Sequence, residues 1–391
     1  MARSPLSPET PATAHDVPFI EYEVRSDHLL DDARELVALV FPHWDAADLD
    51  LTQNTDGITN KRKQGPASWA RSPLIQRPGT GSAALCSCMT NCTSCRMPCF
   101  RVLCIVVRCT NRREGLTLLV RAYGRNTEII IDRGQELRNM ASLARRGMCP
   151  PLYARFRNGL VYGYIPGTVP SPEEMGNEVY APLIARQLAD WGQISLSGDR
   201  SPQLIPTLRR WLGDLPASYG DERKDALFRK HFSLDMLRAE LAEVERLAAL
   251  ADSPVVFSHN DLLSGNIILD ASNTKVSFID YEYANYNYRG FDIANHFNEY
   301  AGFECDYSRC PAKDAQLRWF KAYLDRLGND SSPAALERIY VEVSYMRPAS
   351  HYHWGLWALV QAAISDIDFD YLDYARLRFD KYFEDKALLP K

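Results

Sequence analysis

The chain has 391 residues, 46% of them hydrophobic and 24% charged, which is the composition of a soluble globular protein with room for two lobes. Its 45 basic and 50 acidic residues give a net charge of −5, so there is no electrostatic reason to expect a nucleic-acid partner. The apolar run 102–107 is far shorter than the ~20 residues of a membrane helix, and residues 1–17 lack the apolar core of a secretory signal. We therefore expect no stable membrane insertion and a cytoplasmic location, and we predict a disordered tail over 1–17.

The next part of the chain, residues 18–165, predicts a small β-rich lobe. Residues 31–41 have the apolar spacing of a helix. The segment 54–61 (NTDGITNK) is short and polar, as in a turn between strands. The pattern then predicts strands at 116–123, 128–131, 152–156 and 160–165, and a helix at 132–146.

Residues 64–113 form an insert of different composition within this lobe. No acidic residue occurs over 57–113, and seven of the ten cysteines lie over 86–109. Cys92 and Cys95 form a CxxC pair, which permits a zinc hypothesis, but the cluster has no histidine and no second CxxC. We predict a disordered insert; a translated non-coding segment is the other interpretation.

The remaining residues, 166–391, predict a larger, mostly helical lobe. Apolar periodicity indicates helices near 172–197, 203–213, 222–231, 233–251, 291–301, 312–326, 333–345, 350–365 and 370–385. Short strands are expected at 255–257, 267–269 and 275–279. A strand-rich part followed by a helix-rich part predicts an α+β fold of two lobes.

The segment 258–270 (SHNDLLSGNIILD) carries the most specific pattern. Asp261 precedes Asn266 by five residues, and Asp280 ends the next apolar strand, which is the spacing of kinase catalytic loops. Asp261 would accept the proton of a substrate hydroxyl, and Asn266 and Asp280 would offer Mg²⁺ the oxygen ligands it prefers. We expect His259 to brace the loop. The alternative is that these residues are turn formers between strands.

This segment and the run 276–299 (VSFIDYEYANYNYRGFDIANHFNE) together resemble the choline/ethanolamine kinase family. Leu262, Leu263 and NTDGITNK are more similar to its ethanolamine kinase branch, and the resemblance covers about 18–63 and 115–388. It implies a protein-kinase-like fold, with a nucleotide-binding lobe over 18–165 and a catalytic, substrate-binding lobe over 166–391. It also implies ATP as co-substrate, Mg²⁺, Asp261 as catalytic base, and Asn266 and Asp280 as metal ligands.

On the nucleotide side, NTDGITNK could cover phosphates with its backbone amides, although a plain hairpin turn is the alternative. Arg121 stands where kinase folds place the phosphate-contacting lysine. Glu136 could hold Arg121 by an ion pair, or be a solvated carboxylate at a helix start. The segment 162–165 should be the interlobe hinge that meets adenine. The predicted nucleotide contacts are Gly57, Thr59, Asn60, Arg121, Glu136 and Ile165.

On the substrate side, a small cation needs carboxylates and aromatic faces. Trp354 and Trp357 are three residues apart, so on a helix they share a face. Each could bind an ammonium group by a cation–π contact of about 0.5–2 kcal/mol, although such a pair can also be simple core. The resemblance favours the pocket, and we expect Asp292 to organise the catalytic loop from below. The predicted substrate contacts are Glu282, Tyr283, Asn295, Glu299, Trp354, Trp357 and Tyr374.

These features predict an enzyme that phosphorylates the ethanolamine hydroxyl with ATP, the first step of the phosphatidylethanolamine head-group pathway. Three alternatives stay open: a choline or dual-substrate kinase, an aminoglycoside-type phosphotransferase, and a pseudokinase. In the last case the insert would displace the strand that follows the phosphate loop. For the oligomeric state, the sequence leaves a homodimer open.

Overall fold

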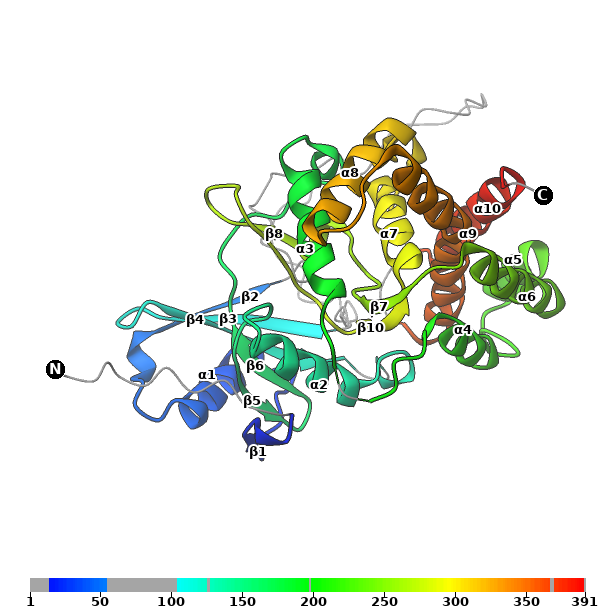
Figure 1. Ribbon diagram of the computed structural model, residues 1–391. Coiled ribbons are helices and arrows are strands. Elements are labelled where there is room, and N and C mark those ends of the chain that lie inside the picture. Colours follow the sequence, from blue (N-terminus) through cyan, green and yellow to red (C-terminus); the bar gives the residue numbers. More distant parts are fainter. Residues whose placement is uncertain (1–13, 55–103, 125–126, 197, 366–368, 390–391) are drawn as a thin grey trace, which may run out of the picture.

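The computed structural model describes residues 14–54, 104–124, 127–196, 198–365 and 369–389. It has a sheet-based N-terminal lobe and a mostly helical C-terminal lobe, which confirms the predicted α+β, two-lobe, protein-kinase-like architecture (Figure 1).

The N-terminal lobe is built on a six-stranded sheet with the order β1-β5-β6-β4-β3-β2. β1 pairs with β5 in parallel, and the other neighbouring strands are antiparallel. Helices α1 and α2 complete the lobe. The bounds are β1 Phe19–Ile20, α1 Leu29–Val40, β2 Leu49–Asn54, β3 Cys104–Asn111, β4 Leu116–Tyr123, α2 Arg133–Ala144, β5 Leu152–Phe156 and β6 Gly159–Gly163.

Strand alternation in β4 decides what faces the interlobe cleft. Leu118 and Val120 join the core under α1, whereas Leu119 belongs to the larger core that continues into the C-terminal lobe. Because successive side chains point to opposite faces of a strand, Arg121 lies on the same face as Leu119. The apolar alternation of β4 therefore delivers one charged side chain into the space between the lobes.

Three predictions for this lobe need correction. The insert was predicted to extend to 113, but Cys104–Asn111 form β3, which pairs with both β2 and β4, so the strand next to the phosphate-loop segment is in place. The predicted strand at 128–131 is wrong: Thr127–Ile129 form a 3-10 helix, and Ile130 and Ile131 are buried where the chain turns into α2. Residues 14–16 of the predicted tail form a 3-10 helix and Val17 is buried.

The C-terminal lobe packs eight described helices around two small sheets, β7–β10 and β8–β9. The helices are α3 Tyr180–Gly192, α4 Leu204–Gly213, α5 Glu222–His231, α6 Leu234–Ala251, α7 Arg289–Asn298, α8 Lys313–Arg326, α9 Pro333–Ile364 and α10 Tyr371–Ala387. The strands are β7 Val255–Ser258, β8 Ile267–Leu269, β9 Val276–Phe278 and β10 Asn285–Tyr288, the last of which was not predicted. Short 3-10 helices are η1 Ala14–Asp16, η2 Ala46–Asp48, η3 Thr127–Ile129, η4 Glu174–Gly176, η5 Ser264–Asn266, η6 Glu299–Ala301 and η7 Tyr307–Arg309.

Helix α9 is continuous, whereas the sequence predicted two helices with a break after 345. Pro348 lies inside it and removes one backbone hydrogen bond. Most residues from Pro348 to Ala362 are buried, because α9 packs against α6, α7 and α10, and this packing holds the helix together through the proline. Among the described helices none is long and apolar enough to cross a membrane.

Candidate active site

The catalytic loop follows β7 and is fixed from α7. The carboxylate of Asp292 accepts hydrogen bonds from the backbone N–H groups of His259 (2.9 Å) and Asn260 (2.7 Å). His259 contacts the Ile279 carbonyl through Nε2 at 3.0 Å. Asn260 has φ 64°, a left-handed conformation that asparagine tolerates better than most residues. The predicted roles of Asp292 as organiser and His259 as brace are confirmed.

Asp261 and Asn266 face each other across this loop. The Asn266 amide donates to the Asp261 carbonyl oxygen (2.7 Å) and to its carboxylate Oδ2 (3.0 Å). Asp261 is only 7% exposed. Burial and the nearby charges of Asp280, Glu299 and Glu282 raise the pKa of Asp261 well above its usual range. Of the predicted trio, Asn266 bonds Asp261 directly, and the charge of Asp280 is one of those that raise the pKa of Asp261.

Asp280 follows β9 at φ 63° and belongs to an acidic group shared by both lobes. Carboxylate oxygens of Glu136, Asp280 and Glu282 lie within 4.8 Å of one another. Burial raises the pKa of Asp280, although Arg121 opposes the shift; burial and the charge of Asp280 raise that of Glu282 to about 7. Three carboxyl groups therefore lie close together in a buried place where their charged forms are less favourable than in water.

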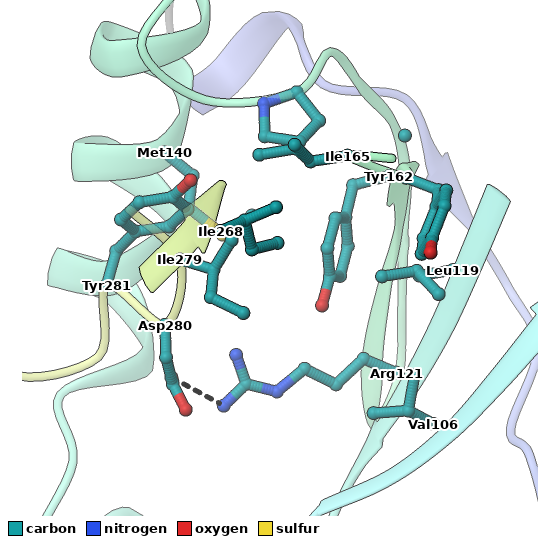
Figure 2. Close-up of a pocket in the computed structure, with 13 residues that line it drawn as sticks. Val106, Leu119, Arg121, Met140, Tyr162, Ile165, Ile268, Ile279, Asp280 and Tyr281 are labelled. Atoms are coloured by element: carbon teal, nitrogen blue, oxygen red, sulfur yellow. Dashed lines mark ion pairs between the residues drawn. The ribbon is translucent and has the colours of Figure 1, made fainter. Parts of the chain in front are cut away.

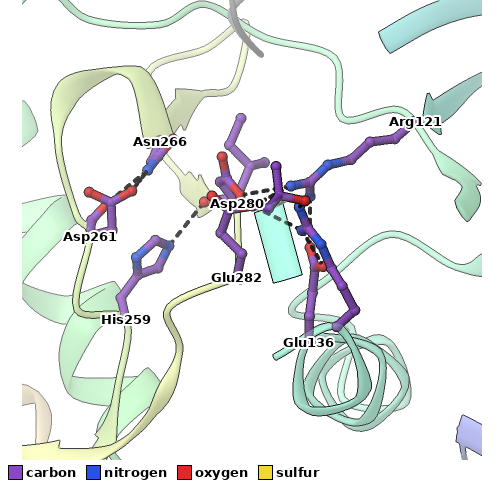
Figure 3. A network of polar contacts seen from close by, with 10 residues as sticks. Arg121, Glu136, His259, Asp261, Asn266, Asp280 and Glu282 are labelled. Carbon is purple, nitrogen blue, oxygen red and sulfur yellow. Dashed lines mark hydrogen bonds and ion pairs between the residues drawn. The ribbon is translucent and has the colours of Figure 1, made fainter. Parts of the chain in front are cut away.

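Two arginines offset part of this charge (Figure 3). Arg121 pairs with Glu136 (Nη1–Oε1, 2.8 Å) and Glu282 (Nη2–Oε2, 2.5 Å), and its Nη2 lies 3.7 Å from Asp280 Oδ1. Glu136 is 0% exposed, so the interpretation as a solvated helix-start carboxylate is wrong and the predicted ion pair is confirmed. Arg133, which was not among the predicted site residues, bonds Glu136 (2.9 Å) and Glu282 (3.2 Å). Its three-residue spacing from Glu136 on α2 was the available signal.

A cavity between the lobes adjoins this cluster (Figure 2). Its walls are mostly apolar, and Arg121 and Asp280 lie at one end of it. Ile165, predicted to lie at the hinge, lines the cavity. The predicted phosphate-loop residues Gly57, Thr59 and Asn60 lie outside the described residues. The other lining residues are Val106, Leu119, Met140, Pro150, Tyr162, Gly163, Tyr164, Ile268, Ile279 and Tyr281.

Tyr283, Trp354 and Trp357 form an aromatic cluster. The ring centroids of Trp354 and Trp357 are 5.5 Å apart, as are those of Tyr283 and Trp354. Trp357 Nε1 donates to the Tyr283 hydroxyl at 3.0 Å. After burial, the charge of Glu282 and that of Asp261 further raise the pKa of Tyr283.

The two carboxylates predicted to bind the substrate ammonium are both paired with arginines. Glu282 bonds Arg121 and Arg133, as described above. Glu299 Oε1 accepts from Arg378 Nη1 at 2.9 Å, and the same nitrogen lies 3.3 Å from the Tyr374 hydroxyl. Arg378, which the sequence analysis missed, is 0% exposed; an arginine one turn after Tyr374 on α10 was its only sequence signal.

The structure gives Asn295 a different role from the substrate contact that the sequence predicted. It is 0% exposed, and both ends of its amide are engaged by protein groups. The Asn295 amide is therefore occupied by protein groups, one of which is the indole of Trp354.

The fold has two lobes, a buried Asp–Asn loop, and an arginine–glutamate pair at the cavity between the lobes. Together these features define the class of kinase-like phosphotransferases. The choline/ethanolamine kinase family model matches residues 102–383, and the chain belongs to this family. The resemblance noted in the sequence is thereby confirmed.

Several relatives are similar over most of the chain. Ethanolamine kinase 2 of Mus musculus is 36% identical over 373 residues, covering 95% of this chain and 85% of the relative. The probable ethanolamine kinase A of Dictyostelium discoideum is 41% identical over 270 residues (69% and 77%). The solved ethanolamine kinase of Plasmodium vivax has a TM-score of 0.67 at 30% identity, covering 72% of this chain and 79% of that structure. A choline kinase from Cryptosporidium parvum shares the fold, with a TM-score of 0.66 at 18% identity (92% and 95%).

Proposed function

We propose that this protein transfers the γ-phosphoryl group of ATP to the hydroxyl of ethanolamine, giving phosphoethanolamine for phosphatidylethanolamine head-group synthesis. The observation that carries the proposal is the position of Asp261. It is buried and bonded by Asn266, and after burial the charges of Asp280, Glu299 and Glu282 raise its pKa. The relatives named as ethanolamine kinases favour ethanolamine over choline as the acceptor.

In this proposal ATP occupies the interlobe cavity. Its adenine would lie among the apolar side chains near Ile165, and its phosphates would point to the end that holds Arg121 and Asp280. The guanidinium of Arg121, held in place by Glu136, offsets negative charge on the transferred group.

The residues around Asp261 fit a magnesium ion. Burial raises the pKa of Asp280, and its buried Oδ1 accepts no hydrogen bond from the described residues, although Arg121 lies 3.7 Å away. Carboxylate and amide oxygens are the ligands Mg²⁺ prefers, and Asn266 and Asp280 would hold it, with Glu282 as a third candidate. When bound, the ion would neutralise charge on the phosphates.

Asp261 would orient the ethanolamine hydroxyl and accept its proton as the oxygen attacks phosphorus. Its raised pKa brings it closer to the range in which a general base works well. The Asn266 amide holds the carboxylate in place through its bond to Oδ2. At the other end of the substrate, the faces of Trp354 and Trp357 would attract the ammonium group.

The test is Asp261→Asn in the full chain, with Asp235→Asn as control because Asp235 is an exposed residue on α6. We expect the Asp261 variant to keep ATP-dependent thermal stabilisation and to lose about 10²–10⁴-fold in kcat. A near-normal rate would refute the assigned role.

Two further assays address the rival functions. The ratio of kcat/KM for ethanolamine and choline decides between the two kinases. A variant lacking residues 64–103 leaves β3 intact; transfer that appears only after this excision would show that the insert disables the chain. A cytoplasmic location and a homodimer stay predictions.

A further inference from the structure

We infer that Asn295 is a positioning residue that fixes the ammonium-binding aromatic cluster relative to Asp261, and thereby selects the length of the amino alcohol. The inference rests on the proposed function and concerns how the same site measures its substrate.

The Asn295 side chain bridges two parts of the site. It comes from α7, and its Oδ1 accepts two hydrogen bonds from α9, one from Trp354 Nε1 at 2.6 Å and one from Ser350 Oγ at 2.9 Å. Its Nδ2 donates to the backbone carbonyl of Asn260 at 3.1 Å. One amide thus joins an indole of the aromatic cluster to the residue just before the catalytic aspartate.

The Asn260 end of this bridge is a sensitive position. Asn260 has φ 64°, and its own side chain bonds the Tyr283 carbonyl and the Asn285 side chain, both at 2.9 Å. The Asn260 carbonyl belongs to the peptide group that leads into Asp261. Because its orientation is fixed by Asn295, a shift of Trp354 would be passed to the Asp261 backbone.

The chemistry at Asn295 calls for an amide. Oδ1 uses its lone pairs on Trp354 and Ser350, and Nδ2 supplies a donor to a carbonyl. A carboxylate would keep both acceptor roles but would face the Asn260 carbonyl with a second oxygen. A buried polar pair left unsatisfied is unfavourable, so we expect the loop to move in such a variant.

The functional consequence follows from the two ends of the substrate. The ammonium group would bind at the aromatic cluster while the hydroxyl must reach Asp261, so the separation of the two sites sets the number of carbons between them. A rigid separation favours ethanolamine over 3-aminopropan-1-ol, because a misplacement of the reacting atoms by about 1 Å can lower the rate about 10²-fold.

The experiment compares Asn295→Asp with Asn298→Asp. Asn298 is a matched control: it is also 0% exposed on α7, and its Nδ2 also donates to α9, at the Arg347 carbonyl (3.2 Å). We expect Asn295→Asp to lower kcat for ethanolamine at least tenfold and to reduce the preference for ethanolamine over 3-aminopropan-1-ol severalfold. ATP-dependent thermal stabilisation should persist. We expect Asn298→Asp to leave the preference unchanged.

If Asn295→Asp does not fold, Ser350→Ala removes one of the bonds that orient the same amide, and a smaller loss of preference is expected. An unchanged preference for ethanolamine in Asn295→Asp would overturn the inference, and Ser350→Ala is judged in the same way if it has to replace that variant. An equal loss of preference in Asn298→Asp would also overturn it.

A second measurement does not depend on activity. Hydrogen exchange of the peptide that contains Asp261 should be faster in Asn295→Asp than in Asn298→Asp, and equal exchange would overturn the inference. Absence of phosphate transfer by the unaltered chain would instead refute the proposed function, so the two failures are distinguishable.

Discussion

The buried ion pair between Arg378 on α10 and Glu299 on η6 allows a quantitative prediction. Their charged atoms are 2.9 Å apart, and the two side chains are 0% and 9% exposed. At an effective dielectric constant of about 20, unit charges about 4 Å apart interact by about 4 kcal/mol. Removing one partner leaves a buried charge, which typically costs about 3–5 kcal/mol. We therefore expect Arg378→Met, which roughly keeps the volume, to lower the free energy of unfolding by this amount.

The assay is urea unfolding followed by tryptophan fluorescence, read as a shift of the midpoint at unchanged slope. Adding Glu299→Gln to Arg378→Met should restore most of the loss, because no uncompensated charge then remains. The control is Arg376→Met on the same helix, since Arg376 pairs with Asp373 and Asp380 at the surface and such pairs contribute about 0–1 kcal/mol. A loss below about 1 kcal/mol for Arg378→Met, or a double variant as unstable as the single one, would refute the reasoning.

Three further predictions concern the pH profile, the sheet and the acidic cluster. Glu299→Gln should move the acid limb of kcat/KM to lower pH. Burial, then the charges of Asp280 and Glu299, raise the pKa of Asp261, so removing the Glu299 charge should lower that pKa. Because Asp261 must be ionised to accept a proton, activity falls as pH drops through its pKa. An acid limb that stays in place would contradict this. Gly159→Ala should destabilise the protein by about 1–3 kcal/mol in thermal or urea unfolding, because a Cβ would lie 2.0 Å from the Arg121 carbonyl oxygen; an unchanged melting temperature would count against it. Asp280→Asn should raise the melting temperature of the ligand-free chain, because burial disfavours the charged carboxylate and raises its pKa, while abolishing stabilisation by Mg²⁺ with ATP; a lower melting temperature of the ligand-free variant would show that the attraction to Arg121 outweighs the cost of burying this charge.

The sequence predicted those parts of the site that are encoded locally. Asp261 and Asn266 are five residues apart, Asp280 ends the next strand, and the two tryptophans share one helix face, so spacing alone brings each group together. The partners of buried charges were not predictable in this way. Arg378 meets Glu299 across 79 positions of sequence, and only the packed lobe shows that the two meet.

The errors in secondary structure have a similar cause. The isoleucines after 128 favour a strand by intrinsic preference, but burial against the core places them in a turn before α2. Pro348 argues for a helix break, yet packing against three helices keeps α9 whole. The absence of acidic residues up to 113 hid β3, although its apolar run 104–107 is of the length and residue types that favour a buried strand.

The pairing of β2 with β3 has a consequence for the position of Arg121. Asn54 is opposite Val106, and Val106 is opposite Arg121, so hydrogen-bonded partners on both sides set the position of β3. β4 is held in turn by β3 on one edge and by β6 on the other. The backbone position that carries the guanidinium of Arg121 is therefore set by strand pairing on both sides.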